Sequence, residues 1–182
     1  MPNTKKKSTI ESFFKKENEA ILKKLDAFGM SLVKLRYEGQ SAQNENFREL
    51  KNLFDGFSEE LCGHLSREEE VVFPFCLSHV PRHQQIINLL RSEYMNVRRG
   101  VRSLRFLLWI FPKRGLAKEK GIVLREIWDA GQYLVFLIQD RFRIKQQALY
   151  EPICAELKTD ECSALKRQMQ GWEKKSCGAC LL

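Results

Sequence analysis

The chain has 182 residues, of which 43% are hydrophobic and 30% are charged, and it carries a net charge of +8. This length and composition allow a folded domain with its own core and exclude a disordered chain. No apolar run approaches the roughly 20 residues needed to cross a membrane. The lysines lie in short runs on several segments, so the positive charge alone does not identify a nucleic-acid or anionic-lipid site.

Four long segments carry apolar residues at helical spacing, which predicts four amphipathic helices. The predicted helices span residues 8–37, 44–73, 82–111 and 117–150. We expect Pro74 and Pro152 to end the second and fourth helices, because proline lacks the amide proton that a helix interior uses. The segment 38–41 and the segment 112–115 read as turns, and residues 163–172 predict a short fifth helix.

Short links between long helices favour antiparallel neighbours. The sequence therefore predicts an all-α fold, an up-down-up-down four-helix bundle over residues 8–152. Residues 153–182 are expected to form a helical extension and a polar tail.

Six cysteines are present, and no apolar core follows the charges of the N-terminal residues. We therefore expect reduced thiols and a cytoplasmic protein. Cys177 and Cys180 have metal or redox spacing, but no second pair accompanies them. A disordered tail and reversible acylation near a membrane both remain open for these two cysteines. His79 and His83 flank Pro81 and could hold zinc, although loop histidines usually face solvent.

Six polar residues interrupt the apolar stripes, and antiparallel topology places all of them near one end of the bundle. They are Asn18, His64, Glu68, Tyr94, Arg141 and Lys145. Ionisable groups in a core are costly unless they are paired or bind an ion, so this polar layer predicts a metal site or an ion-pair network. The alternative is that the long side chains of Arg141 and Lys145 reach solvent from positions beside the core.

The segment from His64 to Pro74 resembles the H-x-x-x-E-E-x-x-x-F-P signature of hemerythrin-like (HHE cation-binding) domains. The segments around Asn18 and Tyr94 stand at the places of the family's single-histidine segments, and residues 140–152 resemble the second copy of the motif. The resemblance implies a di-iron bundle in which His64 and Glu68 are ligand positions.

Carried over position by position, the family's other ligands are replaced by Asn18, Tyr94, Arg141 and Lys145. Arginine stays protonated and cannot bind a metal, and lysine would first have to lose its proton. We interpret the two cations as replacing the positive charge of the metal beside Glu68. No cofactor is then expected, and His64 and Glu68 are vestigial ligand positions.

These substitutions, and the lack of a nucleophile elbow or phosphate loop, predict a protein that is not an enzyme. The favoured interpretation is a structural or regulatory interaction module with a protein partner that the sequence does not identify. One alternative is a metalloprotein that binds iron for dioxygen or nitric oxide sensing or for iron-centre repair. Another is a basic surface that binds nucleic acid or an anionic membrane.

Overall fold

The computed structural model describes residues 4–39 and 41–173, and every regular element in these residues is helical. The all-α prediction is confirmed. The seven α-helices are α1 (Thr4–Tyr37), α2 (Gln43–Arg67), α3 (Phe73–His79), α4 (Gln84–Ile110), α5 (Ala117–Lys145), α6 (Glu151–Glu156) and α7 (Thr159–Glu173).

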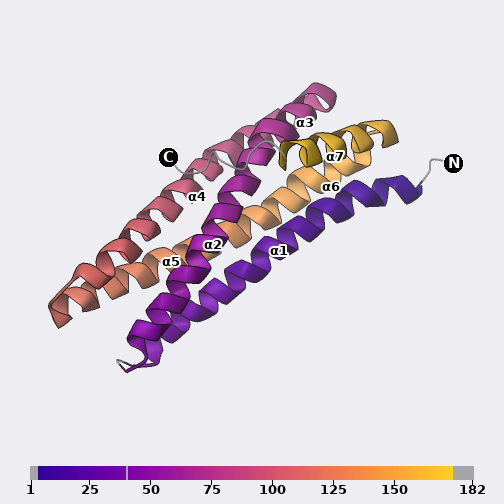
Figure 1. The fold of residues 1–182 in the computed structure, drawn as a ribbon. Helices are drawn as coiled ribbons and strands as arrows, with labels where there is room; N and C mark the ends of the chain where they lie inside the picture. Colours follow the sequence, from indigo (N-terminus) through magenta and orange to yellow (C-terminus); the bar gives the residue numbers. More distant parts are fainter. Residues whose placement is uncertain (1–3, 40, 174–182) are drawn as a thin grey trace.

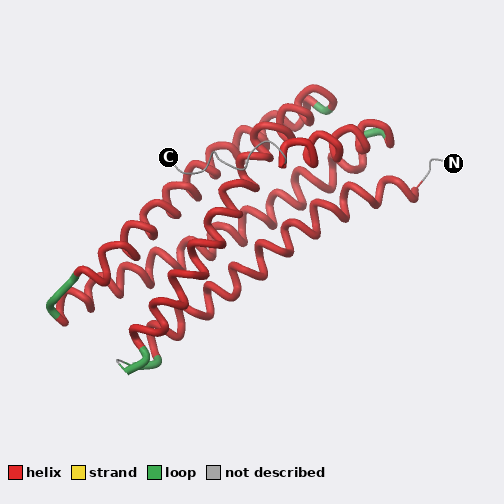
Figure 2. Tube along the Cα trace, in the orientation of Figure 1, coloured by secondary structure: helices red, strands yellow, loops and turns green. Residues whose placement is uncertain are grey.

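Four of these helices are long and lie side by side as a bundle (Figure 1). α1 packs against α2 and α5, and α4 packs against α5 and α2. The α1–α2 and α4–α5 connections lie at one end of the bundle, and α3, α6 and α7 lie at the other (Figure 1). The connections are short (Figure 2), and Gly39 in the first one has φ of 81°, a backbone conformation that favours glycine.

The helical path does not end where Pro74 and Pro152 led us to expect. Each proline follows a π-helical turn, Glu68–Val72 or Gln146–Tyr150, and lies in the first turn of the next helix, α3 or α6. Proline is tolerated in a first turn because the amide proton that it lacks would have no helical partner there. The two prolines therefore begin short helices, and the chain continues past them.

One continuous apolar core runs the length of the bundle and includes the predicted stripes. Leu165 and Met169 of α7 are fully buried in this core, and α7 contacts α1, α2 and the turn Glu68–Val72. α7 therefore covers the end of the bundle where the polar residues were predicted to gather. None of the described helices is long and apolar enough to cross a membrane.

α1 and α5 approach closely at Gly131, where an added Cβ would lie 2.6 Å from Leu32 Cδ1. We expect Gly131→Ala to lower the free energy of unfolding by about 1 kcal/mol, because buried Leu32 cannot move out into solvent. Gly121→Ala, at an open position of α5, is the matched control and should raise it by about 0.5–1 kcal/mol. Urea unfolding measures both, and equal stabilisation by the two changes would contradict the close packing.

Candidate functional site

The centre of the site is the carboxylate of Glu68, which has no solvent exposure. Glu68 is the first residue of the π turn after α2, four residues beyond His64, so both side chains lie on the inward face of the same helical path. An isolated carboxylate in such a place would be strongly destabilising. Its partners therefore decide whether the bundle can fold around it.

Four side chains surround the Glu68 carboxylate. Lys145 Nζ donates to Glu68 Oε1 at 2.6 Å, and the hydroxyl of Tyr150 donates to the same oxygen. The hydroxyl of Tyr94 donates to Oε2, and His64 Nε2 lies 2.9 Å from Oε1. Hydrogen bonds to an ionised group are stronger than those between neutral groups, so this shell favours the carboxylate form.

Lys145 is as deeply buried as Glu68, and its ammonium also lies 3.0 Å from His64 Nε2. A charged lysine can only donate hydrogen bonds and a carboxylate can only accept them, so His64 Nε2 lies between a donor on Lys145 and an acceptor on Glu68. The Lys145 ammonium also sits 4.1 Å from the centre of the Phe142 ring, within cation–π range. The Lys145 ammonium thus contacts a carboxylate, an imidazole and an aromatic ring at the same time.

The pKa values in this cluster follow from burial and from the neighbouring charges. Burial lowers the pKa of His64 below 6.5, although Glu68 opposes the shift, and the ring is therefore neutral at pH 7. Burial alone would raise the pKa of Glu68, but His64 and Lys145 outweigh it and hold that pKa well below its usual range. Burial raises the pKa of Tyr94 and of Tyr150, and the Glu68 charge adds to both shifts, so both hydroxyls keep their protons. Burial lowers the pKa of Lys145, and the charge of Glu68 and its hydrogen bond to the ammonium oppose that shift, so we assign the cluster one negative charge on Glu68 and one positive charge on Lys145.

Tyr150 was not among the predicted site residues. It lies five positions after Lys145, which in a continuous α-helix would turn it well away from the same face. The π turn Gln146–Tyr150 takes up one extra residue and brings the hydroxyl back to Glu68. The same offset after Glu68 gives Phe73, whose ring lies 5.6 Å from that of Tyr94. The sequence does contain a signal for these two aromatic residues. Each stands five positions after Glu68 or Lys145, and a proline follows it within two residues.

Of the six residues in the predicted polar layer, the structure brings His64, Glu68, Tyr94 and Lys145 into direct contact. Arg141 does not join them. Its Nε lies 3.2 Å from a carboxylate oxygen of Glu93 on α4, and its side chain keeps 22% of its exposure. Arg141 lies one helical turn before Lys145 and has its own acidic partner nearer the surface. Lys145 is therefore the cation that compensates Glu68.

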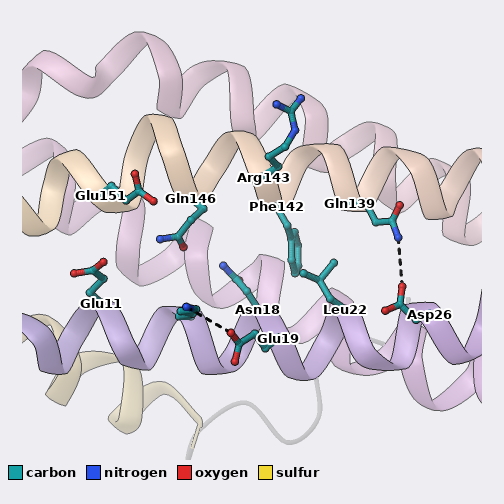
Figure 3. Close-up of a pocket in the computed structure, with 11 residues that line it drawn as sticks. Glu11, Asn18, Glu19, Leu22, Asp26, Gln139, Phe142, Arg143, Gln146 and Glu151 are labelled. Atoms are coloured by element: carbon teal, nitrogen blue, oxygen red, sulfur yellow. Dashed lines mark hydrogen bonds and ion pairs between the residues drawn. The ribbon is translucent and has the colours of Figure 1, made fainter.

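Asn18 is buried on α1, but its Oδ1 has no hydrogen-bond partner among the described residues. Its side chain points into a cavity of about 490 Å³ between α1 and α5, as does that of Gln146 (Figure 3). Phe142 forms part of the wall of this cavity, and Lys145 packs on the Phe142 ring. Asn18 thus lies on the cavity side of the site and does not touch Glu68 through a hydrogen bond.

The other edge of the His64 ring faces a second ion pair. Arg67 Nη2 lies 2.6 Å from Glu17 Oε2 and 3.4 Å from His64 Nδ1. These side chains border a second cavity of about 320 Å³, which Trp172 of α7 also lines. Trp172 donates from Nε1 to Glu70 Oε2 at 2.7 Å and so ties α7 to the π turn that carries Glu68. His64 connects the buried pair to this outer pair.

The donors at this site do not fit a di-iron centre. Within the part of the chain that the structure describes, no group of three or more His, Cys, Asp or Glu side chains could hold a metal ion. His64 and Glu68 are the ligand-type pair at the site, and the ammonium of Lys145 contacts both. A cation cannot share that position with a metal, because the two charges repel and the ammonium has no lone pair.

Residues 9–109 match the hemerythrin HHE cation-binding domain, and the chain belongs to this family. The match spans α1 to α4 and ends before α5, the helix that carries Arg141 and Lys145. A comparison with curated proteins gave no significant match. Membership therefore rests on the part of the bundle from α1 to α4, which keeps the His64–Glu68 motif.

The remaining candidate groups do not converge on a metal. His79 Nδ1 lies 2.9 Å from the Phe75 carbonyl oxygen, and His83 Nε2 lies 2.8 Å from Glu156 Oε1. Among the described cysteines, Cys62, Cys76, Cys154 and Cys162 do not form disulfide bonds, and burial raises the pKa of Cys76 to about 12. Cys177 and Cys180 lie outside the described residues.

The contact between Glu68 and Lys145 predicts a large non-additive effect on stability. Glu68→Gln leaves a buried ammonium without its counter-charge and should lower the free energy of unfolding by about 3–5 kcal/mol. Combining it with Lys145→Met removes both charges at similar volume and should recover much of this loss. The matched control is Glu59→Gln, an exposed position on α2, which should change stability by less than about 0.5 kcal/mol. Denaturant unfolding at neutral pH measures wild type, both single variants, the double variant and the control, and strictly additive effects of Glu68→Gln and Lys145→Met would contradict the pairing.

The lowered pKa of His64 predicts a pH dependence with a definite sign. The unfolded chain binds a proton at this histidine below about pH 6.5, whereas the folded protein binds that proton only at a lower pH. The unfolded state then binds more protons, so the free energy of unfolding falls as the pH drops from 7 to 5. The His64 share is at most about 1.4 kcal/mol per pH unit. His64→Gln should flatten this slope and His79→Gln should not; identical slopes for wild type and His64→Gln would contradict the assignment.

Proposed function

We propose that this chain is a hemerythrin-like up-down-up-down bundle in which an internal ion pair has replaced the di-iron centre. We infer that it is not an enzyme and that it acts in the cytoplasm as a structural or regulatory interaction module. The observation that carries the proposal is the position of Lys145 Nζ, 2.6 Å from Glu68 Oε1 and 3.0 Å from His64 Nε2. The ammonium stands where a metal bound to both side chains would stand.

Physical reasons support a structural role for this pair. The positive charge of Lys145 balances Glu68 without a bound ion, so this bundle does not need iron to remain folded. Tyr94 and Tyr150 supply further donors, which an apolar core around Glu68 would lack. A site that is already neutral and hydrogen-bonded gains little from a metal. We therefore expect this protein to act through contacts at the surface of the bundle, and not through chemistry in its core.

A metalloprotein that binds iron is the second candidate, and one observation favours it. Tyr94 and Tyr150 place two phenol oxygens beside Glu68 and His64, and oxygen donors suit hard metal ions. Lys145 would have to leave its present position for iron to enter. A dioxygen or nitric oxide sensor, or an iron-repair protein, would need such a site.

Iron analysis separates the two candidates. We expect protein purified from iron-supplemented cells to contain far less than one iron per chain after gel filtration, and to show no visible absorption from a tyrosine–iron bond. The matched control restores the family's ligand types with Asn18→His, Tyr94→His, Arg141→His and Lys145→Glu, and folding is checked by circular dichroism. One or more iron per wild-type chain, lost in His64→Ala, would overturn the metal-free proposal.

A further inference from the structure

The net positive charge of this protein is concentrated in one stretch, although lysines and arginines occur along the whole chain. Eight lysine and arginine side chains and one acidic side chain, Glu119, lie between Arg99 and Arg125, so this stretch holds +7 of the chain's net +8. It comprises the second half of α4, the connection and the start of α5, and we call it the α4–α5 hairpin tip. None of its eight cations forms an ion pair with a described carboxylate. Their charge is therefore not neutralised within the described structure.

Large apolar side chains are exposed in the same stretch. Phe106, Trp109, Leu116 and Ile122 keep between 54% and 67% of their exposure. The rings of Phe106 and Trp109 lie 6.1 Å apart, and Lys113 Nζ lies 3.0 Å from the centre of the Trp109 ring. Aromatic and aliphatic side chains among lysines and arginines are typical of segments that lie in a membrane interface.

We propose that the α4–α5 hairpin tip docks on the surface of an anionic phospholipid bilayer. The cations attract the lipid phosphates, and the tip lies at one extremity of the bundle, where a flat surface can reach it (Figure 1). Leu116 and Ile122 separate this proposal from nucleic-acid binding. Aliphatic side chains gain free energy in the acyl-chain boundary, whereas phosphate contacts to DNA or RNA do not use them.

This inference names a partner for the proposed interaction module and rests on that proposal. The tip lies at the end of the bundle opposite α3, α6 and α7 (Figure 1), and Glu68 begins the π turn that leads into α3. Substitutions at the tip therefore leave the buried pair untouched. Iron in the purified protein would overturn the proposed function alone, and failure to bind vesicles would overturn this inference alone.

The test is flotation of the full-length protein with vesicles of phosphatidylcholine, with or without about 30% phosphatidylglycerol. We expect binding to the anionic vesicles only, weakened as salt rises because screening shortens the reach of the charges. The triple variant Lys113→Gln/Arg114→Gln/Lys118→Gln should bind at least about tenfold more weakly. Leu116→Ser/Ile122→Ser should also lose binding although its charge is unchanged.

The matched control is Lys16→Gln/Lys23→Gln/Arg167→Gln, which removes the same charge from exposed positions outside the tip and should bind like wild type. Trp109 fluorescence should shift to the blue with anionic vesicles, and Trp109→Phe should abolish the shift. Three results would overturn the proposal: no binding by wild type, equal loss in the control triple variant, or tighter binding to duplex DNA that Leu116→Ser/Ile122→Ser leaves unchanged.

Discussion

The carboxylate of Glu68 imposes the strictest condition on this fold, because it has no exposed surface and must obtain every partner from protein. Its partners come from His64 on the same helical path, Tyr94 on α4, Lys145 at the end of α5 and Tyr150 in the following π turn. Each bond requires its atoms within a few tenths of an ångström. The carboxylate therefore fixes the relative register of α2, α4 and α5, which apolar side chains alone specify less sharply.

The sequence was sufficient for the large features, because they depend on periodicity. Apolar stripes at helical spacing predicted the long helices and their inward faces, and the same stripes placed His64, Glu68, Tyr94 and Lys145 inside. The prolines were misread, since the rule that proline ends a helix holds only where its amide would have had a partner. At Pro74 and Pro152 a π turn precedes the proline, which lies in the first turn of a new helix, where an amide proton would have no helical partner. Tyr150 was missed for the same reason, because an α-helical register turns it away from Lys145.

Arg141 and Lys145 show a second limit of sequence reasoning. They stand one turn apart on the same stripe, and both are long cations, so spacing gives no ground for choosing between them. The choice depends on neighbours from another helix: Glu93 on α4 lies within reach of Arg141 near the surface, and Glu68 lies within reach of Lys145 in the core. The compact ammonium also fits between the oxygen of Glu68 and the nitrogen of His64, whereas a planar guanidinium needs more room.

The charges of the molecule are thus arranged differently at its two ends. Near α7, Lys145 balances Glu68 and Arg67 balances Glu17, so this end satisfies its buried charges internally. At the α4–α5 hairpin tip the cations have no described acidic partners, and the field of the protein extends from there into solvent. A molecule with such an asymmetry turns its positive end toward a negatively charged surface before contact. The pairing of Glu68 with Lys145 therefore leaves the core neutral, and the uncompensated charge of this bundle lies at its opposite end.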